Sequence, residues 1–459
     1  MSALAAILLS RGHRVSGSDL TGNPQMDELK KLGARVHIGH DKKNLARGVQ
    51  RVIINGAIAD DNPELVEAQR RGLEIVRRED LLAEIARGYK NVIAIAGTHG
   101  KSTTTAMVAA IFRYAALNPT VHNGATGLDG GMGQLHQGGD NFFITEACEF
   151  KKGFLALTPT VTVITNIDAD HMDCYRDMDD VRDTYQQLAG KSRHVVINRD
   201  CPNSKTIMHT SKSAFGCTRC HRVTRLPNGH HRFFSEGLAI TLPIIGIHNV
   251  YNALAAIAVA RHFRISTYTC KKALESFGGI ARRFEHVGKI GEVNVISDYA
   301  HHPTELRTTI DSTNGLYRRI LYVFQPHTYS RTKAHFAEFV DVLGSVRGAK
   351  MSCGGADEFV RDVVLLKTYS AREKPIRDGS AKDLAEYMGL RYFETHASLR
   401  RFVIGVADNY DAVVFMGAGD VDAIPRSINI QRAHGPSGGS TRLSNQSPHH
   451  RKLGRLHQR

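Results

Sequence analysis

The sequence predicts an α/β protein of three domains built on parallel sheets. Short β-branched runs alternate with helical patterns over residues 1–90, a hydrophobic run ending in glycine opens a second unit at Asn91, and a third series of strands and helices begins near Phe284. At 459 residues the chain is also too long for one ordinary hydrophobic core, which favours roughly two to four domains.

In the N-terminal domain, residues 1–90, segments with a helical pattern alternate with strand-like segments. Helical patterns are expected at residues 1–12, 26–34 and 63–72, and strand-like runs at residues 13–19 and 51–58. This alternation is typical of parallel strands joined by crossover helices, as in a Rossmann-like fold. The series begins with a helix, whereas a doubly wound sheet begins with a strand.

The central domain, residues 91–283, repeats the alternation with more strongly buried strands. Strands are expected at residues 92–97, 142–147 and 161–167, and helices at residues 103–116, 180–190 and 252–263. The C-terminal domain, residues 284–430, has expected strands at residues 293–300, 319–325, 363–367 and 412–419 and a helix at residues 334–344. Residues 431–459 have no such pattern and are expected to be a basic, disordered tail.

Charge and composition narrow the class of function. The net charge is +15, but the tail supplies six Lys and Arg without an acid, so nucleic acid is not the expected partner. Hydrophobic residues make up 42% and charged residues 23%, and no run approaches the roughly 18 apolar residues of a spanning helix, so no membrane insertion is expected. Seven scattered cysteines and no export signal favour the cytoplasm, and we expect a monomer or homodimer.

A phosphate-binding loop is the clearest chemical signal. Residues 96–103, AGTHGKST, stand between a hydrophobic strand and a helix. Glycines let backbone N–H groups turn toward an anion, the helix N-terminus adds its dipole, Lys101 can reach terminal phosphates and Ser102 can ligate Mg²⁺. Ile95 stands where the longer form of the motif has its first glycine. The predicted nucleotide-binding residues of the loop are Gly97, Thr98, His99, Gly100, Lys101, Ser102 and Thr103.

Carboxylates and a histidine follow the two next strands of the same domain. Glu146 closes one strand, and Asn166, Asp168, Asp170 and His171 follow the other. Taken singly, each is more often a solvated loop residue. After successive strands of a phosphate-loop domain they are better explained together as ligands of a nucleotide-bound cation.

Eight motifs in order resemble one enzyme family. They are GTHGKST at residues 97–103, EACE at 146–149, TNIDADHMD at 165–173, GIHNVYNALAA at 246–256, RRFE at 282–285, DYAHHPTE at 298–305, FQPHTYSRT at 324–332 and GAGD at 417–420. Together they resemble the Mur ligases of bacterial peptidoglycan synthesis, most closely the members that add L-alanine to UDP-N-acetylmuramate. The resemblance implies three domains, which bind the UDP-sugar, ATP and the amino acid, and an acyl-phosphate intermediate.

The resemblance also implies roles for single residues. Lys101 would grip the β- and γ-phosphates, and Ser102, Glu146 and His171 would hold Mg²⁺. Asn249 and Asn252 resemble adenine-contacting asparagines, and one of Arg282 and Arg283, taken to be Arg283, resembles an arginine that reaches the γ-phosphate. The C-terminal domain would contribute Asp298, which is expected to bind ATP. It would also contribute His301, His302, His327 and Arg331, of which His302 and Arg331 are expected to be catalytic.

Three features depart from that family. The chain begins with what resembles the residues just after the family's first strand and glycine-rich loop, so we expect the start of the N-terminal domain to be truncated. Cys217, Cys220 and His221 form a C-x-x-C-H run, for which a variable hairpin is favoured over haem attachment or a fortuitous zinc site. RGAKMSCGGAD at residues 347–357 is expected to be a surface insertion.

Three alternatives therefore stay open. The alternatives to an L-alanine-adding ligase are a murein-tripeptide recycling ligase of the same superfamily, an inactive homologue that binds ATP only, and a protein that uses its basic tail to bind nucleic acid. The first differs from the leading interpretation in its substrate, and the second in whether the sugar nucleotide binds.

Overall fold

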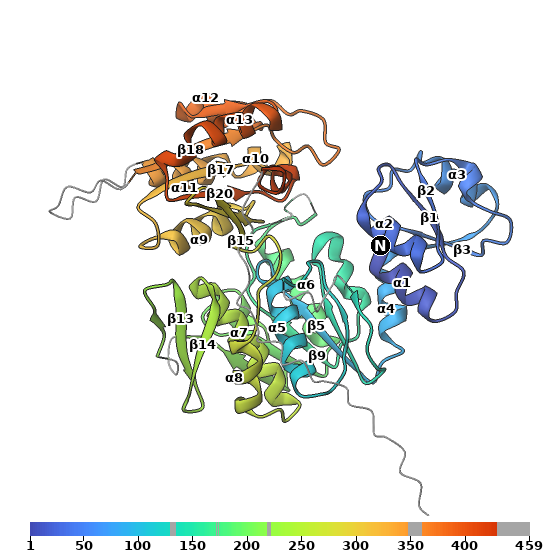
Figure 1. Cartoon of the computed structure of the whole chain (residues 1–459). Coiled ribbons are helices and arrows are strands. Elements are labelled where there is room, and N and C mark those ends of the chain that lie inside the picture. Colours follow the sequence, from blue (N-terminus) through green and yellow to red (C-terminus); the bar gives the residue numbers. More distant parts are fainter. Residues whose placement is uncertain (129–134, 171, 173, 218–221, 348–359, 429–459) are drawn as a thin grey trace, which may run out of the picture.

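A computed structural model describes residues 1–128, 135–170, 172, 174–217, 222–347 and 360–428. In Figure 1 the C-terminal domain lies above the central domain, and the N-terminal domain lies to one side of it. None of the helices formed by the described residues is long and apolar enough to span a membrane. The C-x-x-C-H run after Cys217, most of the expected insertion and the tail lie outside the described residues.

The N-terminal domain contains two separate parallel pairs of strands, β1–β2 and β3–β4. Its strands are exposed or half-buried, whereas parallel sheets are normally covered on both faces. The predicted alternation is present, but the described strands do not join into one doubly wound sheet. The elements are α1 (Ser2–Ser10), β1 (Ser16–Asp19), α2 (Pro24–Lys31), β2 (Arg35–Ile38), a 3-10 turn (Lys42–Asn44), β3 (Arg51–Ile54), α3 (Pro63–Arg70), β4 (Glu74–Arg77) and α4 (Arg78–Ala86).

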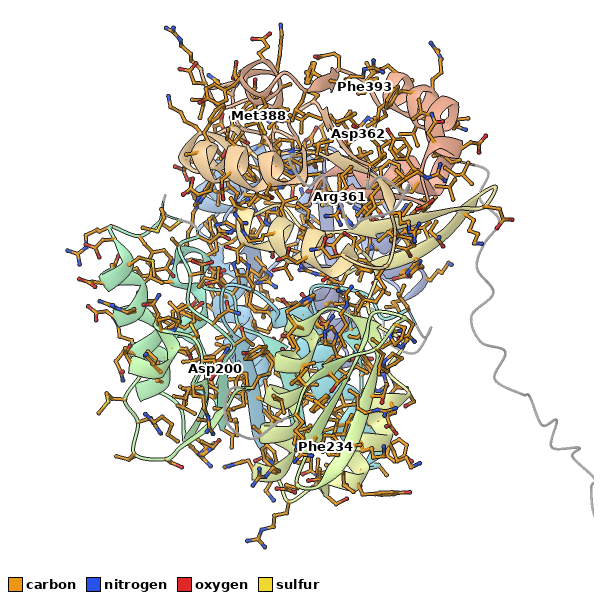
Figure 2. The ribbon with its side chains drawn as sticks, turned by 90° about the vertical axis from the view of Figure 1, so that its left-hand side faces the viewer. Asp200, Phe234, Arg361, Asp362, Met388 and Phe393 are labelled. Atoms are coloured by element: carbon orange, nitrogen blue, oxygen red, sulfur yellow. The ribbon has the colours of Figure 1, made fainter. Side chains whose placement is uncertain are left out.

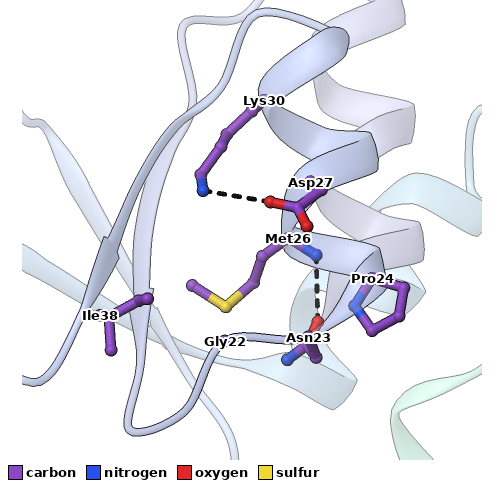
Figure 3. Close-up of a pocket in the computed structure, with 7 residues that line it drawn as sticks. All are labelled: Gly22, Asn23, Pro24, Met26, Asp27, Lys30 and Ile38. Atoms are coloured by element: carbon purple, nitrogen blue, oxygen red, sulfur yellow. Dashed lines mark hydrogen bonds and ion pairs between the residues drawn. The ribbon is translucent and has the colours of Figure 1, made fainter.

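Two helices attach this domain to the central one. Leu4 and Ile7 of α1 and Leu81 and Ile85 of α4 are almost fully buried and belong to the same hydrophobic cluster as Phe143 of the central sheet. Burying such side chains contributes roughly 1.5–3 kcal/mol each. A separate pocket of about 360 Å³ lies beside α2 and is drawn in Figure 3; it is far in the fold from the phosphate loop.

The central sheet places the phosphate loop between two partner strands. Its order is β11-β10-β9-β5-β8-β6-β7, so β5 pairs in parallel with both β8 and β9. Five of the six residues of β5 are buried, as expected for a strand covered on both faces. The elements of this domain are β5 (Asn91–Ala96), α5 (Lys101–Tyr114), β6 (Thr120–His122), β7 (Leu135–His136), β8 (Phe142–Glu146), a 3-10 segment (Phe150–Ala156), β9 (Val161–Ile164), α6 (Met178–Gly190), β10 (His194–Asn198), a 3-10 turn (Ser204–Thr206), β11 (Lys212–Phe215), β12 (Thr224–Arg225), β13 (His230–Ser235), β14 (Leu238–Ile245), α7 (Ile247–His262) and α8 (Thr267–Glu275).

The strand pairing explains why the predicted loop residues meet. Ile95 of β5 is opposite Glu146 of β8, and Ala96 is opposite Ile164 at the end of β9. The carboxyl ends of these parallel strands therefore share one edge of the sheet, directly beneath the loop. The antiparallel sheet β12-β13-β14, which the sequence did not predict, packs beside α7 and α8.

The C-terminal domain has a six-stranded sheet of order β15-β16-β20-β17-β18-β19, parallel except for the β15–β16 hairpin. Figure 2 shows Arg361, Asp362, Met388 and Phe393 in this domain, above Asp200 and Phe234 of the central domain. Its elements are β15 (Glu285–Ile290), β16 (Val293–Asp298), α9 (Pro303–Thr313), β17 (Arg319–Phe324), α10 (Tyr329–Ala334), α11 (Phe336–Arg347), β18 (Val360–Leu366), α12 (Ala381–Met388), β19 (Arg391–Phe393), α13 (His396–Val406), a 3-10 turn (Ala407–Asn409), β20 (Ala412–Met416), a 3-10 turn (Asp420–Asp422) and α14 (Ala423–Ser427).

Candidate active site

The phosphate loop depends on two glycines. Gly97 has φ of 134° and Gly100 has φ of 81°, both in the region that side chains disfavour. A Cβ atom on Gly97 would lie 1.9 Å from the Thr165 hydroxyl oxygen, and one on Gly100 would lie 2.5 Å from the Asn252 Oδ1 atom. The loop therefore approaches its neighbours too closely for any other residue, and α5 begins directly after it at Lys101.

Lys101 is held by oxygen atoms of the protein. Its Nζ donates to the Gly97 carbonyl at 2.6 Å, to the Thr98 carbonyl at 3.0 Å and to both carboxylate oxygens of Glu149 at 3.0 Å. Burial lowers the pKa of Lys101, but the Glu149 carboxylate outweighs burial and the pKa is raised above 10.5. Lys101 is therefore a fixed positive charge at the mouth of the loop, and Glu149, only 3% exposed, is its counterion.

Ser102 and Glu146 both contact the short segment formed by Asn123 and Gly124. Asn123 Nδ2 donates to the Ser102 carbonyl at 3.2 Å, and the next residue, Gly124, donates its N–H to Glu146 Oε1 at 2.6 Å. A hydroxyl and a carboxylate are hard oxygen donors, which Mg²⁺ prefers, so these two residues fit the predicted cation. His171, the third predicted ligand, lies outside the described residues.

His99 links the loop to the C-terminal domain. Its Nε2 lies 3.2 Å from Asp168 Oδ2 and its Nδ1 lies 3.2 Å from Glu305 Oε1 at the start of α9. Burial lowers the pKa of His99, but hydrogen bonds and charges of these carboxylates outweigh it and raise the pKa to about 9. The imidazolium is therefore shared between two domains.

Glu305 is the centre of this interdomain contact. Besides His99 it accepts the His301 backbone N–H at 3.1 Å, and its Oε1 lies 3.8 Å from Arg283 Nη1. Burial raises the pKa of the Glu305 carboxyl, but His301 and His99 outweigh burial and hold the pKa well below its ordinary value. Glu305 therefore stays ionised, and its carboxylate holds His99 and Arg283 beside the phosphate loop.

His302 and Arg331 contact the segment that follows β9. His302 Nε2 lies 3.2 Å from the Ala169 carbonyl, and Arg331 Nη2 donates to Asp170 Oδ1 at 3.0 Å. Burial and the nearby charge of His99 lower the pKa of His302 to about 4, which leaves the ring neutral. Both predicted C-terminal residues thus contact the segment after β9, and His327 Nδ1 lies 3.3 Å from Arg331 Nη1.

The two adjacent arginines of the interdomain connection point to different places. Arg282 donates to the carbonyls of Gly417 and Gly419 at 2.7 and 2.9 Å and thereby ties the connection to the C-terminal domain. Arg283 instead approaches Glu305, next to the loop. The geometry therefore favours Arg283 over Arg282 as the arginine that reaches a phosphate.

Asp298 supports the same connection from beneath. Its carboxylate accepts the backbone N–H groups of Phe284 and Ala300, both at 2.8 Å, and burial raises its pKa. Phe284 and Arg282 have φ of 51° and 59°, a conformation that costs roughly 1–2 kcal/mol per residue. Asp298 thus holds this strained connection in place, and its predicted contact with ATP stays a prediction.

Asn249 and Asn252 lie behind the loop. Asn249 Nδ2 donates to the Ile245 carbonyl at 2.7 Å, and Asn252 Nδ2 donates to Asn249 Oδ1 at 3.1 Å. Asn252 Oδ1 in turn accepts the Thr104 hydroxyl of α5 at 3.2 Å. Both amides are buried and join α7 to the start of α5, and their contact with adenine stays a prediction.

Two residues at the centre of the site were not among those predicted, Glu149 and Glu305. Each belongs to a motif that carried the resemblance, EACE and DYAHHPTE, but nothing in the sequence assigned it a partner. Both are acids inside a motif, and both pair with a residue of the phosphate loop, Glu149 with Lys101 and Glu305 with His99. An acid within such a motif is the signal that could have indicated them.

Comparisons with known proteins agree with this arrangement. Residues 1–90 match the Mur ligase catalytic-domain family, residues 95–260 the Mur ligase middle domain, and residues 282–419 the Mur ligase glutamate-ligase domain. A UDP-N-acetylmuramate–L-alanine ligase of Lachnospira eligens is 38% identical over 450 residues, covering 92% of this chain and 94% of that protein. The chain belongs to the Mur ligase family. A ligase of the same name from Clostridium acetobutylicum is also 38% identical to this Mur ligase, over 92% of the chain and 93% of that protein.

Solved structures show the same three-domain arrangement. The UDP-N-acetylmuramate–alanine ligase of Thermotoga maritima superposes on this Mur ligase with a TM-score of 0.75 at 26% identity, covering 93% of the chain and 95% of that structure. A murein peptide ligase of Psychrobacter arcticus superposes with a TM-score of 0.68 at 20% identity, which supports the fold alone. The predicted three-domain α/β Mur architecture is therefore confirmed.

Replacing Glu305 by glutamine tests the interdomain ion pair through stability. The pKa of His99 lies above its ordinary 6.5, so the stabilisation is fully present below about pH 6.5 and is lost as pH rises through about 9. We expect Glu305→Gln to cost about 1.5–3 kcal/mol of unfolding free energy near pH 6.5 and clearly less above pH 9. Denaturant unfolding of both proteins across this pH range measures the difference.

A matched control is Glu338→Gln. Glu338 is an exposed acid on α11, and its carboxylate lies 3.7 Å from His335 Nδ1. This variant should change the unfolding free energy by under about 0.5 kcal/mol at every pH. A cost of Glu305→Gln that did not change with pH would contradict the charged pairing of His99.

Proposed function

We propose that this Mur ligase joins L-alanine to the lactyl carboxylate of UDP-N-acetylmuramate at the expense of ATP, in peptidoglycan synthesis. The observation that carries the proposal is the meeting of Lys101, His99 and Arg283 at the phosphate loop, where one domain supplies the loop and another closes over it. The relatives that share 38% identity over nearly the whole chain carry this activity in their names.

The reaction class explains why the site gathers cations rather than a covalent nucleophile. A carboxylate oxygen bonds to the γ-phosphorus as the bond to ADP breaks. The amine then bonds to the acyl carbon, and the amide forms as phosphate leaves and the nitrogen loses a proton. Charge develops on phosphate oxygens in the first step, so fixed positive groups stabilise the transition state. Lys101 and Arg283 are those groups in this proposal.

Ser102, Glu146 and His171 would hold Mg²⁺, which neutralises phosphate charge when bound. We propose that Asn249 and Asn252 lie toward the adenine and that Gly97, Thr98, Gly100 and Thr103 shape the anion site. His302 and Arg331 would complete the amino-acid side, since both reach across from the C-terminal domain. Asp298 would act by holding the hinge, and His301 by fixing Glu305 beside the loop.

The remaining parts of the proposal concern the other domains. The N-terminal domain would bind the UDP-sugar, and the protein would act in the cytoplasm as a monomer or homodimer. Domain closure over the substrates is expected, because the charged groups of the site lie on two domains.

Phosphate release tests the proposed reaction. The protein is incubated with ATP, Mg²⁺, UDP-N-acetylmuramate and either L-alanine or the murein tripeptide, and release is expected with L-alanine only. Release with the tripeptide alone would assign the recycling reaction instead. Calorimetric titration separates the other alternative, since ATP binding without UDP-sugar binding would identify a homologue that binds ATP only.

A further inference from the structure

We infer that His99, Asp168 and His302 form a binding site for a zinc-class divalent cation between the central and C-terminal domains. One ligand atom of each residue lies within 4.8 Å of the others. His99 comes from the phosphate loop, Asp168 from the segment after β9 and His302 from the N-terminus of α9. These residues are different from Ser102, Glu146 and His171, which are proposed for Mg²⁺.

The ligand types favour zinc over magnesium. Two imidazoles and one carboxylate leave a fourth position open, which is a common zinc arrangement in proteins, whereas Mg²⁺ prefers oxygen donors alone. Nickel and cobalt ions accept the same donors, so the class is a transition-metal dication rather than one element.

His99 already has the support that a metal-binding histidine needs. Its Nε2 faces Asp168 at 3.2 Å, and its Nδ1 faces Glu305 Oε1 at 3.2 Å. A histidine that binds metal through one nitrogen usually donates the other N–H to a carboxylate, which fixes the ring and makes it a better donor. Glu305 is placed to be that second carboxylate.

The other two residues are also fixed in place. Asp168 Oδ2 accepts the Thr304 hydroxyl at 3.1 Å, and its backbone N–H donates to the Thr98 hydroxyl at 2.9 Å. His302 is 4% exposed, and its Nδ1 accepts the Thr304 N–H in a long bond of 3.3 Å. Coordination through His302 Nε2 would move its proton to Nδ1, and the cost is two hydrogen bonds: the one from Nε2 to the Ala169 carbonyl at 3.2 Å and the weak one from the Thr304 N–H to Nδ1.

Occupancy of the site would fasten the two domains to each other. His302 and Glu305 move with α9, whereas His99 and Asp168 belong to the central domain. A cation shared by these residues would hold α9 against the phosphate loop and would engage a residue of the loop itself. We therefore expect Zn²⁺ and ATP to weaken each other's binding.

Metal binding by the full chain tests this inference without any ligase assay. Cys217→Ser and Cys220→Ser are introduced first, because their C-x-x-C-H run is a competing zinc motif. Zn²⁺ alone is then titrated by equilibrium dialysis, and one site that is tighter than the background of surface histidines is expected. His302→Gln should weaken this site at least about 10-fold, and Glu305→Gln about 10- to 100-fold.

His335→Gln is the matched control, since the His335 ring lies 4.7 Å from the His302 ring but is not one of the three ligands. It should leave the affinity for Zn²⁺ unchanged. Equal affinity of the His302→Gln variant and its parent would overturn the inference.

A ligand exchange guards against a variant that simply fails to fold. His302→Cys places a thiolate among the ligands, so Co²⁺ should give a sulfur-to-cobalt charge-transfer band that the parent lacks. A His302→Cys protein that melts like its parent but gives no such band with Co²⁺ would also overturn the inference.

Discussion

Lys101→Ala is expected to lower the rate of phosphate release by about 10²–10³-fold, because it removes the preorganised positive charge that would stabilise the transferred phosphoryl group. Lys101 begins α5, and its ammonium donates back to the Gly97 and Thr98 carbonyls of the phosphate loop. The loss should appear in kcat as well as in kcat/KM, since the charge acts on the transition state. Initial rates at saturating ATP measure it.

The same variant leaves the buried Glu149 carboxylate without its ammonium, so folding needs its own control. Thermal unfolding of Lys101→Ala shows whether the protein is intact at the assay temperature, and Lys205→Ala, a change at an exposed lysine of the same domain, should behave like the parent in both measurements. A folded Lys101→Ala protein with a near-normal rate would contradict the proposed phosphate role.

Gly97→Ala is expected to weaken ATP binding strongly while the rest of the molecule stays folded. The new Cβ would lie 1.9 Å from the Thr165 hydroxyl oxygen, and the backbone at φ of 134° is one that alanine rarely adopts. The Thr165 hydroxyl also donates to the His99 carbonyl at 2.7 Å, so moving this side chain would release the loop. Calorimetric titration with ATP is the measurement, and a loss of at least about 100-fold in affinity is expected, roughly 2.7 kcal/mol.

Gly190→Ala is the comparison for that experiment. Gly190 ends α6, has no positive φ and would place a Cβ with nothing within 4 Å, so the change should be silent. ATP affinity of Gly97→Ala within threefold of the parent would show that the loop does not grip the nucleotide.

The local chemistry of the site could be predicted from the sequence, because it depends on residues close together in the chain. The strand–loop–helix at Gly97 and the acids after β8 and β9 follow from hydrophobic runs and turn residues alone. Parallel pairing then brings Glu146 and Asp168 to the loop without further information. The Mur resemblance added the C-terminal residues that face it.

The remainder depends on how the domains meet, which no local pattern encodes. Glu149 becomes the partner of Lys101 only because the turn after β8 folds under the loop, and Glu305 meets His99 only because α9 lies across it. The hinge role of Asp298 and the turn of Arg282 away from the loop likewise follow from tertiary position. The alternation of helices and strands in the N-terminal domain predicted one sheet and could not indicate two separate pairs of strands.

The four oxygen atoms around Lys101 would compete with a nucleotide phosphate for its ammonium group. A nucleotide that arrives does not meet a bare cation but has to replace Glu149, so the measured ATP affinity is the difference between two ion pairs. Such an exchange keeps the number of paired charges constant, and binding should therefore depend less on ionic strength than four phosphate charges would suggest. It also gives selectivity, since a weakly charged anion gains too little at Lys101 to displace a carboxylate that is already in place.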